Sequence, residues 1–71
     1  MSELLTAREA IARFAGLYYE KLYALAEHNL IHPVQPNGRI LYPEWELSAI
    51  QKRYPTWDVT RMVDDDFAKR L

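Results

Sequence analysis

Residues 6–29, TAREAIARFAGLYYEKLYALAEHN, carry the pattern that decides the fold. Thr6 and Glu9 have the spacing of a capping box, in which the side chain of each residue accepts a hydrogen bond from the backbone N–H of the other. Apolar residues follow at helical spacing, and Glu9 and Arg13 are expected to form an ion pair four residues apart. The pattern therefore predicts a first helix over about 6–15.

A second helix is predicted almost directly after Gly16. Apolar residues recur at helical spacing over residues 18–28, and Asn29 suits the left-handed conformation that often ends a helix. Two helices joined by two or three residues around a glycine form a helix-turn-helix arrangement.

A hairpin is predicted after these two helices. Asn37-Gly38 separates two short β-prone runs, residues 30–34 and 39–42, and Asn-Gly is the strongest local signal for a tight hairpin turn. Two prolines in this stretch confine it to the edge of a sheet, because proline lacks the N–H that a central strand needs.

The C-terminal part of the chain carries two further helical patterns. A third helix is predicted over 44–54, after Pro43 and before Pro55. The stretch 57–71 beyond it is amphipathic. Its apolar face comprises Val59, Met62, Val63, Phe67 and Leu71.

These elements together predict a mainly α fold with a small β-hairpin. The specific expectation is a winged helix-turn-helix domain over residues 1–55, with the hairpin as its wing, and an amphipathic helical tail over 56–71. The 71 residues allow one small domain, which buries only about 60% of its unfolded surface. Four aromatic residues either complete this small core or form a partner-binding surface: Tyr42, Trp45, Tyr54 and Trp57.

The composition excludes several kinds of site. The chain has no cysteine, which excludes a disulfide, a thiolate nucleophile and a cysteine-bound zinc ion. The two histidines, His28 and His32, have no third ligand type beside them in the sequence, and no paired carboxylates suit acid–base catalysis. No apolar run approaches the roughly 20 residues of a membrane span. We therefore expect a cytoplasmic, non-enzymatic protein without a membrane segment, metal or cofactor.

Residues 4–54 resemble the winged helix-turn-helix domain of phage excisionases and the related MerR-type regulators. The motifs that carry the resemblance are Leu5-Thr6-x-x-Glu9-Ala10, Gly16-Leu17, Leu22-Tyr23-x-Leu25, Leu30-Ile31, Gly38-Arg39, Tyr42-Pro43 and Leu47. The resemblance implies a small DNA-binding protein of phage or mobile-element type, acting as an excisionase-like architectural factor or a transcriptional regulator. It places the second helix in the major groove and the wing against the adjacent minor groove or backbone.

The charges of the chain depart from that family. Nine basic and ten acidic residues give a net charge of −1, whereas nucleic-acid binders usually carry a basic excess. The second helix has Glu20, Ala24 and Glu27 where the family usually presents Arg or Lys. A second hypothesis is therefore a protein-interaction module, an inhibitor or adaptor of a phage or host protein, whose second helix binds protein in place of DNA.

Two sets of candidate contact residues follow. The set predicted to contact double-stranded DNA comprises Arg8, Tyr19, Lys21, Tyr23, His28, Asn37 and Arg39. Arg39 follows the turn glycine, from which a side chain can reach a minor groove or a phosphate, and the alternative is that its stem packs on a neighbouring aromatic ring.

The second set is predicted to form an oligomer or partner interface. It comprises Trp57, Val59, Met62, Val63, Phe67 and Leu71. A helix of this length is marginal alone in water, so its apolar face needs a cover. The cover is either the core of the same domain or the same tail on a second copy, and the small size of the domain favours self-association in a dimer or array.

Overall fold

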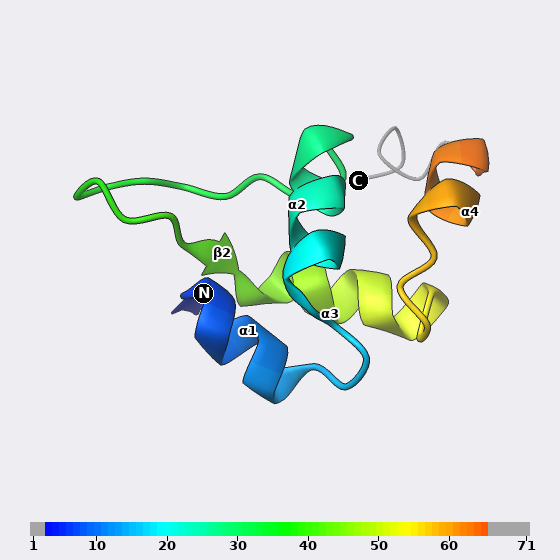
Figure 1. Ribbon diagram of the computed structural model, residues 1–71, viewed down its shortest axis with the longest axis horizontal. Helices are drawn as coiled ribbons and strands as arrows, with labels where there is room; N and C mark the ends of the chain where they lie inside the picture. The colour runs from blue at the N-terminus through cyan, green and yellow to red at the C-terminus, as the bar shows by residue number, and fades with distance from the viewer. Residues whose placement is uncertain (1–2, 66–71) are drawn as a thin grey trace.

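The computed structural model describes residues 3–65, which form four helices and a two-stranded antiparallel sheet (Figure 1). The helices are α1 (Ala7–Arg13), α2 (Tyr19–Glu27), α3 (Glu44–Arg53) and α4 (Val59–Asp64), and the strands are β1 (Leu4–Leu5) and β2 (Tyr42–Pro43). The predicted class, a mainly helical fold with a small antiparallel β element, is confirmed. The three predicted helices over 6–15, 18–28 and 44–54 agree with α1, α2 and α3 to within two residues at each end.

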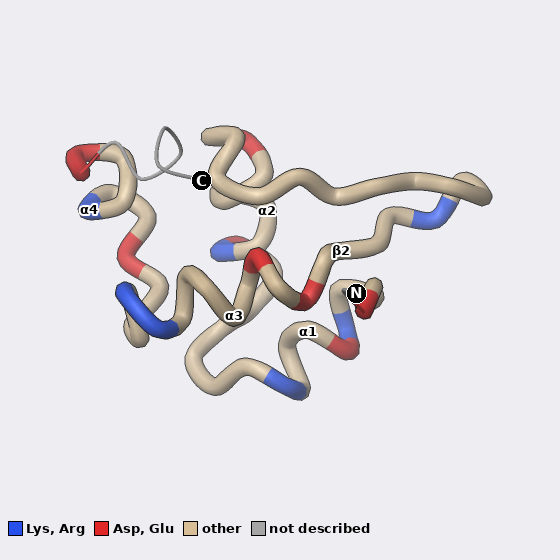
Figure 2. Tube along the Cα trace, turned by 180° about the vertical axis from the view of Figure 1, so that it is seen from behind, with Lys and Arg blue, Asp and Glu red and all other residues tan. Residues whose placement is uncertain are grey.

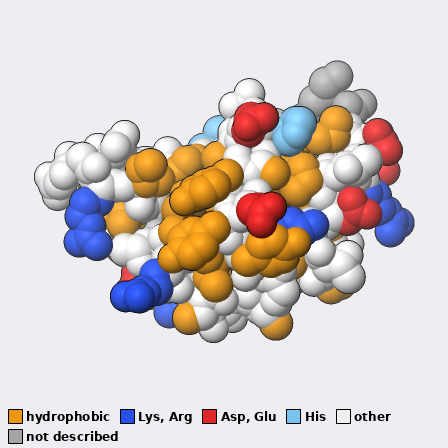
Figure 3. All heavy atoms as spheres, in the orientation of Figure 1, with side chains coloured by type: hydrophobic (Ala, Val, Ile, Leu, Met, Phe, Trp, Pro, Cys, Tyr) orange, Lys and Arg blue, Asp and Glu red, His pale blue; other side chains and the backbone are white. Residues whose placement is uncertain are grey.

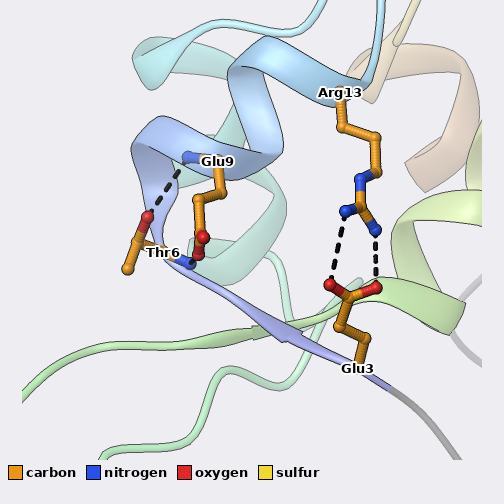
Figure 4. A network of polar contacts seen from close by, with 4 residues as sticks. All are labelled: Glu3, Thr6, Glu9 and Arg13. Atoms are coloured by element: carbon orange, nitrogen blue, oxygen red, sulfur yellow. Dashed lines mark hydrogen bonds and ion pairs between the residues drawn. The ribbon is translucent and has the colours of Figure 1, made fainter.

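The capping box at the start of α1 is formed as predicted (Figure 4). The Glu9 N–H donates to Thr6 Oγ1 at 3.2 Å, and the Thr6 N–H donates to Glu9 Oε1 at 2.9 Å. The predicted pairing of Arg13 with Glu9 is wrong, because the Glu9 carboxylate is taken up by the cap. Arg13 instead donates to both carboxylate oxygens of Glu3, at 2.7 and 3.3 Å, and this hydrogen bonding lowers the pKa of Glu3.

The end of α2 is a Schellman motif. The Leu30 N–H donates to the Leu25 carbonyl at 2.9 Å, and the Asn29 N–H donates to the Ala26 carbonyl at 3.1 Å. Asn29 has a φ of 59°, the left-handed conformation predicted for it. The motif satisfies two carbonyls at the helix end and turns the chain towards the hairpin.

The hairpin projects from the body of the molecule (Figure 1). Val34 and Leu41 exchange two backbone hydrogen bonds of 2.8 Å each, and the Asn37-Gly38 turn lies between them, with Gly38 at a φ of 79°. The base of the hairpin continues into β2, which pairs with β1. The pairing of Leu4 and Leu5 with this base is not predicted by the sequence, since two residues are too few for a strand pattern to be recognised.

The core combines residues from all four described helices and from the loops between them. Its buried apolar residues are Leu5, Ala10, Phe14, Leu17, Leu22, Leu25, Leu30, Ile31, Tyr42, Leu47, Ile50, Tyr54, Trp57 and Met62. Three of the four C-terminal aromatic residues are thus core residues, whereas Trp45 is 48% exposed on α3.

The chain folds back after α3 so that Trp57 covers the turn between α1 and α2. Its indole is completely buried, its Nε1–H donates to the Ala15 carbonyl at 2.9 Å, and its ring meets Phe14 edge to face with centroids 5.8 Å apart. A Cβ atom added at Gly16, which has a φ of 83°, would lie 3.4 Å from the indole. The indole of Trp57 therefore packs closely against the turn at Ala15 and Gly16.

The structure corrects the predicted tail interface at two positions. Trp57 and Met62 are completely buried in the chain's own core, because the domain needs their apolar surface for its own stability. Val59 is half-buried against that core, and Val63 is 43% exposed. Phe67 and Leu71 lie outside the described residues.

We expect Trp57→Ala to lower the free energy of unfolding by about 3–5 kcal/mol, since it removes a buried aromatic side chain and leaves a cavity. Trp57→Phe should cost about 1–3 kcal/mol, because the Ala15 carbonyl then loses its donor. Urea denaturation followed by circular dichroism measures both values. Val63→Ala is the control and should stay within about 0.5 kcal/mol of the wild type. If Trp57→Ala leaves the free energy of unfolding unchanged but reduces self-association, Trp57 would belong to an intermolecular interface and not to the core.

Candidate functional site

The exposed face of α2 is aromatic. Leu22 and Leu25 on the inner face are completely buried, while Tyr19 and Tyr23, one helical turn apart, are 47% and 59% exposed. Their rings pack on each other with centroids 6.2 Å apart and planes inclined at 37°. Figure 3 shows hydrophobic side chains gathered over α2 and beside it, on the side of the hairpin. Large exposed rings in a small domain mark a surface that is suited to contact with another molecule.

Tyr42 of β2 belongs to the core and not to this exposed aromatic surface. Tyr42 of β2 is buried, and its burial raises the pKa of its hydroxyl group. The hydroxyl group of Tyr23 raises this pKa further. The exposed aromatic pair of this face is therefore Tyr19 and Tyr23 of α2.

The remaining charged residues of α2 are mostly acidic. Glu20 and Glu27 are exposed on the same helix as the two tyrosines. Lys21 is only partly exposed, and its Nζ lies 6.0 Å from the centre of the Tyr18 ring. Lys21 is therefore on the flank of the helix, where it balances only part of the negative charge.

The other basic candidates lie on α1 and on the hairpin, beside the aromatic surface. Arg8 is exposed in the first turn of α1, and Asn37 and Arg39 are exposed at the tip of the hairpin. Figure 3 shows basic side chains on the side of the hairpin and α1. The tube in Figure 2 shows that Lys and Arg residues also occur at the far end of α3 and on α4, so the cations do not form a single stripe. His28, the last candidate, is exposed at the C-terminal end of α2.

A buried carboxylate holds the first arm of the hairpin in place. Glu46 of α3 is only 3% exposed, and its Oε1 accepts a hydrogen bond of 2.7 Å from the backbone N–H of His32. Its Oε2 lies 2.7 Å from His32 Nδ1. The sequence contained one signal for this contact, a carboxylate among the inward-facing apolar residues of the third helix, but it did not identify the partner.

Glu46 is expected to stabilise the hairpin through the backbone of His32. Glu46→Ala removes the acceptor of a part-buried N–H and should lower the free energy of unfolding by about 1–3 kcal/mol. His32→Ala keeps that hydrogen bond and loses only the contact of a ring that is 65% exposed, so it should cost less. Urea denaturation of the two variants gives the comparison. Equal losses in both would show that the ring, and not the backbone, makes the important contact.

Other kinds of site find no support in the part of the chain that the structure describes. Among residues 3–65, no three His, Asp or Glu side chains gather in an arrangement that could hold a metal ion. None of the helices in that range has both the length and the apolar character that crossing a membrane requires.

Comparison with protein families, with curated proteins and with solved structures yields no match. A proposal for the function therefore rests on the residues of this chain alone.

Proposed function

We propose that the chain binds duplex DNA as a small winged helix-turn-helix protein, with α2 at the major groove and the 34–41 hairpin as the wing. The observation that carries the proposal is that the exposed face of α2 and the arginine-bearing hairpin share one side of the molecule (Figure 3). The connection around Gly16 between α1 and α2 is five residues long, where two or three were predicted. This connection and the pairing of the hairpin base with β1 support the assignment.

The chemistry of the face suits contacts to both the backbone and the bases. Arg8 and Arg39 would bind phosphates, and Asn37 at the hairpin tip would donate to a phosphate or to a base edge in the minor groove. The hydroxyl groups of Tyr19 and Tyr23 would donate to phosphates along the major groove. Glu20 and Glu27 repel phosphates, which lowers the overall affinity. A glutamate can also accept a hydrogen bond from cytosine N4, which would favour binding to particular DNA sequences.

Such a protein would act as an excisionase-like architectural factor or a small transcriptional regulator of a phage or mobile element. The test is a titration of random duplex DNA at several salt concentrations. The slope of log K against log salt reports the number of phosphates neutralised. A measurable affinity without a salt slope, or no affinity at low salt, would contradict the proposal.

Arg39→Ala is expected to weaken DNA binding and to reduce the salt slope by about 1, since it removes one phosphate contact. Lys52→Ala is the matched control, because it also removes one exposed cation but lies in the last turn of α3, away from the hairpin (Figure 2). The same titration measures both variants. Equal effects would mean that Arg39 contributes only to the overall charge.

Glu27→Gln is expected to raise the affinity for random DNA by up to about fivefold, as expected from an exposed charge interaction of about 1 kcal/mol. Asp64→Asn on α4 removes the same charge elsewhere on the surface and should leave the affinity nearly unchanged. If the two variants behave alike, α2 does not lie near the phosphates.

A second candidate function is protein binding through α2. It is favoured by the packed and exposed Tyr19–Tyr23 pair and the neighbouring carboxylates, which are typical of a protein interface more than of a DNA-binding helix. The DNA titration separates the two functions, since this one leaves the wild-type chain with negligible DNA affinity. Tyr23→Ala should then abolish the protein contact.

A further inference from the structure

The face in Figure 3 combines three zones of different chemistry. The aromatic zone comprises the packed pair Tyr19 and Tyr23. The acidic flank comprises Glu20 and Glu27, one helix position further round α2, and Lys21 beside Tyr18 lies beyond it. The basic flank comprises Arg8 of α1 and Arg39 of the hairpin. The basic flank lies on the side of the hairpin, and the acidic flank lies over α2. The Tyr19–Tyr23 pair thus lies between exposed cations on the side of the hairpin and two exposed carboxylates of α2, of which Lys21 offsets a part.

We propose that a second copy of this chain covers this face in a symmetric dimer. The aromatic zones of the two protomers would pack against each other at the centre. The basic flank of each protomer would then meet the acidic flank of the other.

The arrangement of charge favours a second copy over other occupants. In a symmetric dimer the twofold axis can lie in the interface plane and run along the aromatic zone. Rotation about this axis brings the basic flank of one protomer opposite the acidic flank of the other. A face with opposite charges on either side of the axis is therefore complementary to itself. A basic peptide would leave Arg8 and Arg39 facing like charge, and a nucleic acid would leave Glu20 and Glu27 facing phosphates. A second copy pairs the basic flank with the acidic flank in two symmetry-related contacts.

The size of the face limits the strength of the dimer. A standard interface buries about 800 Å² on each partner, which is about one sixth of the 4820 Å² of accessible surface of this chain. Tyr19 and Tyr23 are each about half exposed, and Val34 and Ile40 of the hairpin add further exposed apolar surface. We therefore expect a reversible dimer with a Kd in roughly the micromolar range.

The dimer would cover α2 and Arg39, so DNA and the second copy would exclude each other. The self-association itself is independent of DNA, and only this competition rests on the proposed function. Dilution of the protein, or competition by DNA at high local concentration, would then dissociate the dimer and expose the face that binds DNA.

The experiment uses two charge-reversed variants of the full chain. Glu20→Arg with Glu27→Arg makes both flanks basic, and Arg8→Glu with Arg39→Glu makes both flanks acidic. Each variant alone should be monomeric at concentrations where the wild type is dimeric by sedimentation equilibrium. An equimolar mixture of the two should form a heterodimer, because opposite charges then meet again across the interface.

The control carries Lys52→Glu with Arg61→Glu, which changes the net charge as much as the acidic variant does but on α3 and α4. It should dimerise as the wild type does, and circular dichroism verifies that all variants fold. A wild type that is monomeric up to millimolar concentration, or a mixture that does not associate when the wild type does, overturns the proposal. DNA titration of the wild type, at concentrations where it is monomeric, tests the other hypothesis separately: a wild type that dimerises at high concentration but whose monomer has no DNA affinity supports the self-association and refutes DNA binding.

Discussion

The contact of the Trp57 indole with the turn at Ala15 and Gly16 is the interaction on which the rest of the structure depends. It joins the segment after α3 to the connection between the first two helices, and so fixes α2 from a part of the chain about forty residues away. Trp57 itself has a φ of 57°, a conformation that costs a bulky residue of the order of 1–3 kcal/mol. Complete burial of the indole and its edge-to-face contact with Phe14 offset that cost. The orientation of the tyrosine face therefore depends on a residue that is not part of it.

The partners of the cations matter more for function than their number. Arg13 is bound to Glu3, Lys21 lies over Tyr18, and Arg61 is within 4.0 Å of Asp65. These contacts engage three cations with other side chains, so contact with a phosphate backbone at the α2 face would depend mainly on Arg8 and Arg39. A net charge of −1 is thus compatible with a locally basic flank, and the count of charges in the sequence does not show where that flank lies.

Local signals in the sequence predicted the described helices well and placed the turn of the hairpin. The two predicted β runs, 30–34 and 39–42, are reduced to the single Val34–Leu41 bridge and the start of β2. The capping box, the left-handed Asn29 and the Asn-Gly turn each depend on residues within a few positions of one another, which is why they can be recognised without a structure. Contacts between distant segments were missed or misjudged for the opposite reason. The Glu3–Arg13 pair and the hydrogen bonds of Glu46 to His32 join residues ten or more positions apart. The burial of Trp57 and Met62 depends on how the chain folds back after α3. The sequence names the candidate contact residues one by one, but how the basic, aromatic and acidic ones are grouped on the surface is a property of the tertiary structure.

The hairpin is held at its base by two different elements. Glu46 of α3 fixes the arm that begins at His32, and β1 pairs with the continuation of the other arm, while residues 35–40 at the tip are all exposed. Opening of the tip therefore breaks few contacts, whereas displacement of the base disturbs the core, so the two parts of the hairpin differ in local stability. The tip can adapt its shape to the curvature of whatever it touches without loss of the fold. The base keeps the hairpin in one position relative to α3 and β1 while the tip changes shape.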